Sequence, residues 1–259
     1  LARVTAMSNT AVLGIDIGGT GIKGAPVDLS KGDFATDRLR IPTPAVSTPE
    51  AVADVVAQIA EHFADQIGDA PIGVTIPAIA AHGITRSAAN IDKSWIDAPA
   101  EQIFSERLGR PVHLVNDADA AGVAEVKYGD AQNPGLVIVA TLGTGIGTAL
   151  IHRGVLIPNS ELGHIEIDGK NAESQAAASV KTRLGLKYIE YVPRLQRYFE
   201  TLEFLLSPDL FVVGGGISKD ADKYLPHLKL RTPIIPAKLR NKAGIIGAAW
   251  LAADAAGRT

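Results

Sequence analysis

Apolar positions along the chain recur with two different spacings, which predict alternating strands and helices. Two apolar runs, Ala11–Ile15 and Ile22–Leu29, flank a pair of glycines and predict a β-hairpin. A segment resembling a capping box with an early proline follows, at Ser47, Pro49 and Glu50. The next apolar residues recur at helical spacing and predict a helix with one buried face; they are Val52, Val55, Val56, Ile59 and Phe63. Ile72–Ile76 predicts a short strand. Because a helix between two such strands is a crossover connection, the order favours an α/β fold.

The second half of the chain repeats the order of strand, glycine turn and strand. Leu136–Thr141 is a nearly continuous apolar run, and Leu142–Ile151 (LGTGIGTALI) predicts a glycine turn followed by a second strand. A hydrophobic helix around Leu195–Leu206 leads to a strand at Leu210–Val213 that ends in three glycines, and the alanine-rich Gly247–Ala256 predicts a final helix. The repeat indicates two related lobes, each with a glycine turn.

Composition and charge narrow the classes of protein. Of the 259 residues, 46% are hydrophobic and 20% charged, which is typical of a globular protein. The formal charge of -3 provides no global field for nucleic acid, so any polyanion must bind a local patch. The absence of cysteine excludes a disulfide framework and any thiolate zinc site. No apolar run reaches membrane-spanning length and the first ten residues lack the core of a secretory signal, so we expect a cytoplasmic location.

The segment GIDIGGTGIKG places small residues at the bend of the first predicted hairpin. Gly18 and Gly19 allow positive φ and leave room for a bulky anion, so their amides can cradle phosphate. Thr20 adds a hydroxyl, Lys23 a cation, and Asp16 a carboxylate that could hold the Mg²⁺ of a phosphoryl donor. The alternative is an ordinary Gly-Gly hairpin turn.

Glycine turns follow three of the predicted strands. They are Gly18-Gly19, Gly143-Thr144-Gly145 and Gly214-Gly215-Gly216. Three turns in a chain without a Walker sequence indicate a nucleotide or phosphate cleft between two lobes. Because the GTGIG spacing differs from the dinucleotide fingerprint, a Rossmann oxidoreductase is disfavoured.

Two further segments, one at Asp117 and one at ELGHIEIDG, have side chains suited to chemistry on a polyol. Asp117 follows an apolar strand and precedes a predicted helix, where an aspartate is either a cap or an exposed carboxylate that accepts the proton of a hydroxyl nucleophile. The run ELGHIEIDG contains Glu161, His164, Glu166 and Asp168, which could hydrogen-bond sugar hydroxyls. A solvated strand edge is the alternative, and the spacing is not that of a zinc helix.

Basic residues gather near the C-terminal end, and we call them the late basic cluster. They are Lys219, Lys223, Lys229, Arg231, Lys238, Arg240 and Lys242, offset by Asp220 and Asp222. Such a run is usually a solvated surface, and it could also be a track for a long anionic donor.

These motifs together resemble the ROK family of sugar kinases and repressors, over about Val12 to Trp250. GIDIGGTGIKG resembles the first phosphate motif of that family, ATLGTGIGTALI the second, and VVGGGISK the segment beside the nucleotide base. The resemblance implies an α/β, two-lobed actin-like ATPase (ribonuclease H-like) fold with a cleft between the lobes. Residues 10–115 would form the small N-terminal lobe and residues 116–243 the large C-terminal lobe, with a helix at about 244–256 packing back on the first.

The resemblance also implies roles for individual residues. LVNDADAAG matches the catalytic segment, which makes Asp117 the general base and Asn116 a sugar contact. SAANID matches the sugar-site segment through Asn90, and ELGH matches the sugar-binding signature through Glu161 and His164. A further sugar ligand of the family corresponds by rough position to a glutamate, Glu173.

One departure from the family pattern is informative. The family usually has a cysteine-rich zinc motif after ELGH, whereas this chain continues into DGKNAESQAAAS without cysteine. No zinc site is therefore expected. This loss, together with SAANIDKSW and NDADAAGVAEV, is similar to the polyphosphate-dependent subgroup of actinobacterial glucokinases and glucomannokinases.

The resemblance therefore implies a kinase that phosphorylates the 6-hydroxyl of glucose, and in some members also of mannose, from inorganic polyphosphate or ATP with Mg²⁺. An ATP-only glucokinase is the alternative. A sugar-responsive repressor is disfavoured, because only a short stretch precedes Val12 and leaves no room for a DNA-binding helix-turn-helix. We expect no nucleic-acid or membrane partner, and either a monomer or a homodimer.

Overall fold

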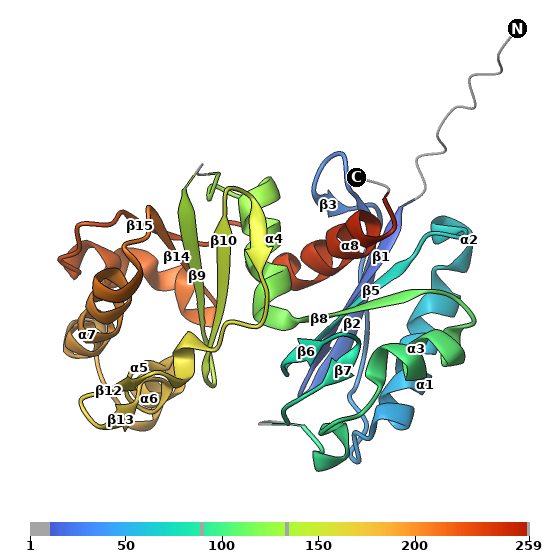
Figure 1. Ribbon diagram of the computed structural model, residues 1–259, viewed down its shortest axis with the longest axis horizontal. Coiled ribbons are helices and arrows are strands. Elements are labelled where there is room, and N and C mark those ends of the chain that lie inside the picture. The colour runs from blue at the N-terminus through green and yellow to red at the C-terminus, as the bar shows by residue number, and fades with distance from the viewer. Residues whose placement is uncertain (1–10, 89–90, 133–134, 258–259) are drawn as a thin grey trace, which may run out of the picture. The chain divides into compact units, whose positions relative to one another are not determined.

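The computed structural model describes residues 11–88, 91–132 and 135–257, which divide into two compact units (Figure 1). The N-terminal unit comprises the described residues up to Val115 together with those from Ala248 onward. The C-terminal unit comprises Asn116–Gly247. Each unit has its own β-sheet with helices packed on it, so each is of the α/β class.

A six-stranded sheet forms the centre of the N-terminal unit, in the order β3-β2-β1-β5-β8 with β4 also paired to β2. Its strands are β1 (Val12–Gly18), β2 (Gly21–Asp28), β3 (Asp33–Phe34), β4 (Leu39–Ile41), β5 (Ile72–Ile76) and β8 (Val112–Asn116). The antiparallel β1–β2 pair confirms the predicted hairpin. The parallel β1–β5 pair confirms the predicted crossover through α1 (Pro49–His62).

The first hairpin is tighter than the sequence predicts. Gly18 pairs with Gly21, so only Gly19 and Thr20 remain in the loop. The expectation that Asp16 and Gly18 lie in the turn is therefore wrong. The physical reason is that two-residue loops are the preferred connection between antiparallel strands, so pairing extends through the flanking glycines.

Helix α1 covers one face of this sheet together with α3 (Ala100–Leu108) (Figure 1). The apolar face predicted for α1 is buried, in contact with side chains from β1, β2 and β5; the buried residues of α1 are Pro49, Val52, Ala53, Val55, Val56 and Ile59. The N-cap is Thr48 rather than the predicted Ser47, and its hydroxyl accepts a hydrogen bond from the Ala51 N–H at 3.3 Å. The remaining elements here are α2 (Ala64–Ile67), β6 (Ala80–Ala81), β7 (Ile84–Thr85) and a 3₁₀ turn, η1 (Lys93–Trp95).

The C-terminal helix α8 (Ala243–Ala255) contributes its second half to the N-terminal unit. A Cβ at Gly73 in β5 would collide with the Ala248 carbonyl, so the helix backbone lies directly on the strand. Because side chains alternate along a strand, this contact is on the face opposite to that of the buried neighbours Ile72 and Val74. A glycine at position 73 is therefore required by close packing.

A five-stranded sheet, in the order β11-β10-β9-β14-β15, forms the centre of the C-terminal unit. Its strands are β9 (Leu136–Leu142), β10 (Ile146–His152), β11 (Val155–Ile157), β14 (Leu210–Gly214) and β15 (Ile234–Pro236). Strand β9 is antiparallel to β10 and parallel to β14. The predicted second hairpin and the predicted strand before the three glycines are thereby confirmed.

Alternate residues of β9 face different helices of the C-terminal unit. Ile138 and Ala140 share a core with α7 (Tyr188–Leu206), whereas Val137 and Val139 share one with Val126 of α4 (Asp117–Tyr128). Helix α7 begins at Tyr188, before the predicted start at residue 195. The prediction began too late because a proline usually ends or kinks a helix, whereas here the helix continues through Pro193.

The other elements of this unit are short. They are β12 (Glu166–Ile167), β13 (Lys170–Asn171), α5 (Glu173–Ala176), α6 (Ala178–Arg183) and four 3₁₀ segments, η2 (Leu162–His164), η3 (Gly216–Lys223), η4 (Leu225–His227) and η5 (Arg240–Lys242). Among the helices that the structure describes, none is both long and apolar enough to span a bilayer.

Candidate active site

The first glycine turn exposes the backbone of Gly19 and the side chain of Thr20 at its tip. A Cβ added at Gly19 would meet no atom within 4 Å, and both Gly19 and Thr20 are exposed. Neither Gly18 nor Gly19 has a positive φ. A Cβ at Gly18 would lie 3.0 Å from the Gly21 carbonyl oxygen, whereas the space above Gly19 is open. An anion can approach this backbone closely.

Asp16 and Lys23 face each other across this hairpin. They are partners in the strand register, and the Lys23 ammonium lies 3.6 Å from a carboxylate oxygen of Asp16. The other carboxylate oxygen accepts a hydrogen bond from the buried Thr75 hydroxyl at 3.0 Å. The carboxylate is thus held in one orientation, close to the glycine turn.

Two residues beside this turn were missed by the sequence analysis. The Arg40 guanidinium donates a hydrogen bond to the Thr20 carbonyl at 2.7 Å, and it lies so close to Gly21 that a Cβ there would collide with it. The Thr43 hydroxyl donates to the Gly18 carbonyl at 2.5 Å. Thr43 also lines a cavity of about 210 Å³ next to the turn. Only the tertiary pairing of β4 with β2 brings Arg40 here, so no local sequence signal could have revealed it.

The second and third glycine turns lie next to each other in the C-terminal unit. They follow the parallel strands β9 and β14, and Gly214 pairs with Thr141. Gly215 has φ +80°, and a Cβ at this position would collide with the Leu142 carbonyl. At Gly143 and Gly216, in contrast, a Cβ would meet no atom within 4 Å. In this pair of turns, close packing therefore requires glycine at position 215, whereas Gly143 and Gly216 expose their backbone.

Thr144 and Gly145 complete the second turn, which is fixed from α6. The Ser179 hydroxyl donates to the Thr144 carbonyl at 2.6 Å, and the Ser179 N–H donates to the Gly143 carbonyl at 3.0 Å. Both bonds use carbonyls, so they hold the turn without occupying the hydroxyl of Thr144.

Glu173 connects the second glycine turn to the ELGH segment. One carboxylate oxygen accepts a hydrogen bond from the Ile146 N–H at 2.9 Å, directly after Gly145. A Cβ at Gly145 would collide with this carboxylate, so glycine makes the contact possible. The other oxygen lies 4.0 Å from Nδ1 of His164. Glu173, which the sequence placed only approximately, thus contacts the second glycine turn and lies near the ELGH segment, where Nδ1 of His164 has a nearer partner in the Asn171 side-chain nitrogen at 3.2 Å.

Glu161 and His164 lie close together at the ends of η2. Nε2 of His164 lies 3.6 Å from a carboxylate oxygen of Glu161, and both side chains are half-exposed. Burial raises the pKa of the Glu161 carboxyl, the His164 imidazole lowers it, and the nearby Glu173 carboxylate raises it. Glu161, His164 and Glu173 offer several hydrogen-bond acceptors at one accessible surface, an arrangement suited to a polyol.

Asn116 and Asp117 begin helix α4. The Asn116 side-chain oxygen is the N-cap and accepts hydrogen bonds from the N–H groups of Ala118 and Asp119 at 2.9 and 3.1 Å. The cap is therefore Asn116 rather than Asp117. Asp117 is partly exposed, and one of its carboxylate oxygens accepts from the Ala118 N–H at 2.8 Å. Because the side-chain oxygen of Asn116 already accepts these two hydrogen bonds, a sugar contact from this residue would use its amide nitrogen.

Most of the predicted site residues lie in the described part of the chain, and they fall into two groups, one in each unit. Asp16, Gly18, Gly19, Thr20 and Lys23 gather at the β1–β2 turn of the N-terminal unit. The C-terminal unit contains the second and third glycine turns, the start of α4 and the ELGH segment. Asn90 lies outside the described residues.

Asp16 is the predicted magnesium ligand. Among the described residues there is no group of three or more histidines, aspartates or glutamates that could hold a metal. Mg²⁺ in kinases commonly uses one or two carboxylates together with water and donor phosphates. Asp16 is an oriented carboxylate beside the first glycine turn, and one such carboxylate fits that donor set.

Three members of the late basic cluster have carboxylate partners. Lys223 is paired with Asp220 at 2.6 Å, Lys238 with Asp130 at 2.7 Å, and Arg231 with Glu203 at 3.5 Å. Asp168, from the ELGHIEIDG run, is likewise engaged in an ion pair, with Arg197 at 2.7 Å. The basic partner of each pair is exposed, which is typical of a solvated surface, although Glu203 itself is buried.

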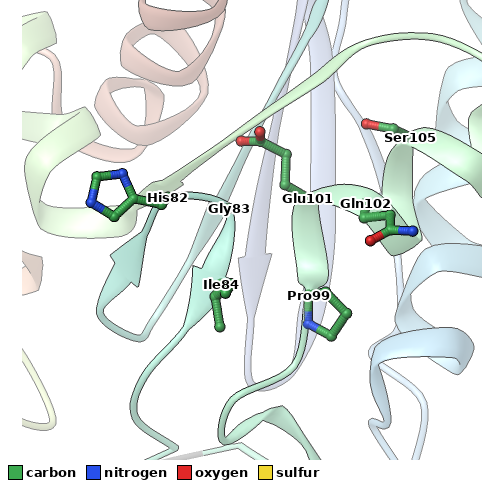
Figure 2. Close-up of a pocket in the computed structure, with 7 residues that line it drawn as sticks. All are labelled: His82, Gly83, Ile84, Pro99, Glu101, Gln102 and Ser105. Atoms are coloured by element: carbon green, nitrogen blue, oxygen red, sulfur yellow. The ribbon is translucent and has the colours of Figure 1, made fainter.

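A second cavity, of about 320 Å³, lies between the β6–β7 hairpin and α3 (Figure 2). His82 and Gly83 of the hairpin and Glu101 and Ser105 of α3 line it. The carboxylate of Glu101 accepts from the Leu114 N–H at 2.9 Å, and the Ser105 hydroxyl accepts from the N–H of Val112, at 3.2 Å. Both polar side chains thus fix β8, and none of the predicted site residues lines the cavity.

Comparison with known proteins shows which family has this arrangement. The ROK family profile matches residues 12–179. The polyphosphate glucokinases of Mycobacterium tuberculosis H37Rv and Mycobacterium leprae are 49% and 48% identical over 238 residues, which is 91% of this chain and 89% and 72% of those proteins.

A solved structure is similar over nearly the whole length. The inorganic polyphosphate/ATP-glucomannokinase from Arthrobacter sp. strain KM has a TM-score of 0.89 and 55% identity, covering 95% of this chain and 100% of that one. The predicted mixed α/β fold of the actin-like ATPase type and the resemblance stated from the motifs are both confirmed. With the family profile matching well over half of its length, the chain belongs to the ROK family.

Proposed function

We propose that this protein is a hexose kinase that transfers a phosphoryl group from inorganic polyphosphate or ATP to the 6-hydroxyl of glucose. The relatives of 49% and 55% identity are a polyphosphate glucokinase and a polyphosphate/ATP-glucomannokinase, which supports both the reaction and the donors. The structural observation that supports it most directly is Glu173, which contacts a phosphate-type glycine turn with one oxygen and approaches His164 with the other.

In this proposal the donor phosphates bind the exposed backbone of the three glycine turns. Gly19, Gly143 and Gly216 leave open space where a side chain would otherwise stand. Lys23 and Arg40 lie at or beside the first turn and supply positive charge. Asp16 would hold Mg²⁺, which offsets charge on the transferring group when bound.

The hexose would bind the acidic surface of the C-terminal unit. The carboxylates of Glu161 and Glu173 would accept hydrogen bonds from its hydroxyls, and the His164 imidazole would accept or donate one. The amide nitrogen of Asn116 would donate a further hydrogen bond to the sugar. Asn90 is proposed as a further sugar contact from the family resemblance alone. Mannose differs from glucose only in the orientation of one hydroxyl, and we include it as a second acceptor.

Asp117 is proposed as the general base. A partly exposed carboxylate at the start of α4 can accept the proton of the 6-hydroxyl as its oxygen attacks the terminal phosphoryl group. The new bond joins the sugar oxygen to phosphorus, and the bond from phosphorus to the rest of the donor breaks. The shortened polyphosphate, or ADP, leaves with the electron pair of that bond.

We further propose that the functional lobes are residues 10–115 with the helix at about 244–256, and residues 116–243. Division of the chain at Val115 and Gly247 supports this assignment. The location proposed for the enzyme is cytoplasmic, and a monomer or a homodimer would each be compatible with a site built from one chain.

A comparison of donors tests the proposal. Steady-state kinetics would be measured with glucose as acceptor and either ATP or nucleotide-free long-chain polyphosphate as donor, each with Mg²⁺. We expect turnover with both donors. Turnover with ATP alone would exclude polyphosphate and assign the late basic cluster to ordinary surface, and no turnover with either would overturn the proposal.

A further inference from the structure

Asp119 is a buried carboxylate that the proposed mechanism does not use. It lies in α4 two residues after Asp117 and is 1% exposed. One oxygen, Oδ2, accepts a hydrogen bond from the Asn159 N–H at 2.7 Å. The other oxygen, Oδ1, is buried and has no hydrogen-bond partner among the residues that the structure describes.

Stability alone does not explain a carboxylate at this buried position. Burying a charged or unpaired polar oxygen costs free energy, and an apolar side chain of similar size is often neutral or better at such a position. Burial accordingly raises the pKa of Asp119 to about 7, with smaller upward contributions from Glu161 and Asp117. The hydrogen bond to Asn159 is the interaction that an apolar residue could not make.

Asn159 begins the segment that leads into ELGH, and its backbone is unusual. It has φ +59°, a left-handed conformation that is uncommon for residues other than glycine and that asparagine adopts more readily than most. A hydrogen bond to a carboxylate can hold such a residue in place. Asp119 therefore fixes the chain two residues before Glu161.

The same segment is fixed again on both sides of Glu161. The hydroxyl of Thr148, a buried residue of β10, donates to the Ser160 carbonyl at 2.7 Å and accepts from the Leu162 N–H at 3.1 Å. Gly163 lies so close to the Ile146 carbonyl that a Cβ would collide with it. The backbone from 159 to 163 is thus held at several points, while the Glu161 side chain stays half-exposed.

We propose that Asp119 is a positioning residue for the hexose site: through Asn159 it ties the catalytic helix α4 to the segment that presents Glu161 and His164. The inference rests on the proposed function in that Glu161 and His164 bind the sugar. Its consequence is that loss of the carboxylate weakens hexose binding and leaves donor binding intact.

The same helix provides a matched control. Glu125 is also 1% exposed, and its two carboxylate oxygens accept hydrogen bonds from the N–H groups of Lys238 and Leu239 at 3.0 and 2.7 Å. It ties α4 to a segment remote in sequence from Glu161. Glu125→Ala therefore removes an equally buried anchor without touching residues 159–164.

The test compares Asp119→Ala, Asp119→Val, Asp119→Asn and Glu125→Ala with the unmodified chain. The apolar variants should fold, because they remove an unpaired buried oxygen, and valine refills most of the volume. We expect them to raise the KM for glucose about tenfold, which corresponds to about 1.4 kcal/mol, with the donor KM within about twofold. Asp119→Asn retains an acceptor and should restore most of the affinity, and Glu125→Ala should leave the glucose KM unchanged.

Hydrogen exchange supplies a readout that needs no activity. Amides in residues 159–164 should exchange faster in both apolar variants and at the normal rate in Glu125→Ala. Unchanged exchange there, an unchanged glucose KM, or failure of both apolar variants to fold while Glu125→Ala folds would overturn the inference. A lack of glucose phosphorylation by the unmodified chain would instead contradict the proposed function, so the two failures are distinguishable.

Discussion

The carboxylate of Glu173 accepts a hydrogen bond from the Ile146 N–H at 2.9 Å, and its other oxygen lies 4.0 Å from Nδ1 of His164. A single side chain thus contacts the second glycine turn and lies near the ELGH segment. Gly145 makes this possible, because a Cβ there would occupy the position of the carboxylate. Glu173 therefore couples the geometry of the proposed donor and acceptor sites.

This coupling predicts that Glu173→Ala impairs both substrates. Loss of a hydrogen bond to a charged group costs about 1.5 to 3 kcal/mol, so we expect the KM values for glucose and for the donor each to rise about tenfold or more. Glu173→Gln keeps an acceptor for the Ile146 N–H and should spare the donor KM. Glu61→Gln, at an exposed position of α1 to which no site role is assigned, is the control. An effect of Glu173→Ala on only one substrate would show that the residue does not couple the two sites.

Asp117→Asn tests the general base. The amide keeps the size of the side chain but cannot take up the proton of the 6-hydroxyl, so kcat should fall about 10² to 10⁴-fold. Glucose binding, measured by calorimetry, should remain close to that of the unmodified chain. Near-normal turnover would remove Asp117 from the mechanism.

Arg40→Ala tests a residue that no motif indicated. Its guanidinium lies at the Thr20 carbonyl beside the first glycine turn, so its loss should raise the donor KM about tenfold at low salt and less at high salt. The glucose KM should not change. Arg38→Ala, which removes a nearby exposed arginine, is the control. Equal effects of both substitutions would indicate a general loss of charge rather than a contact with the donor.

The raised pKa of Asp119 predicts a pH dependence of stability. The folded chain holds this proton up to about pH 7, whereas the unfolded chain releases it near the ordinary value of 3.8. The resulting contribution to the free energy of unfolding is complete below about pH 4 and is lost as the pH rises through 7. Asp119→Asn lacks this contribution. Between pH 5 and pH 8, urea denaturation should therefore show the free energy of unfolding of the variant rising relative to that of the unmodified chain. Parallel pH profiles would refute the assignment.

Much of the fold follows from sequence patterns that report local structure. Helical spacing identified the buried face of α1, and glycine punctuation identified both hairpins. The limits of the elements were less certain. The sequence pattern alone did not reveal that pairing continues to Gly18 and Gly21, or that α7 runs through Pro193.

The candidate site was predictable only as far as its residues belong to recognisable motifs. Arg40 and Thr43 reach the first turn through the pairing of β4 with β2, and Asp119 reaches Asn159 through packing of α4 beside β10. These are contacts between positions distant along the chain, so no periodicity or spacing could report them. Glu173 was found by approximate position, and its bond to the Ile146 N–H required the structure.

The central claim is that the chain moves a phosphoryl group from an inorganic or nucleotide donor to the 6-hydroxyl of glucose. Phosphorus NMR of the unmodified protein with glucose, Mg²⁺ and nucleotide-free long-chain polyphosphate, and separately with ATP, tests it most directly. The account predicts that the resonance of glucose 6-phosphate grows with either donor and that Asp117→Asn nearly abolishes it. Donor signals that stay constant beside glucose, or a phosphate ester at another hydroxyl, would contradict it.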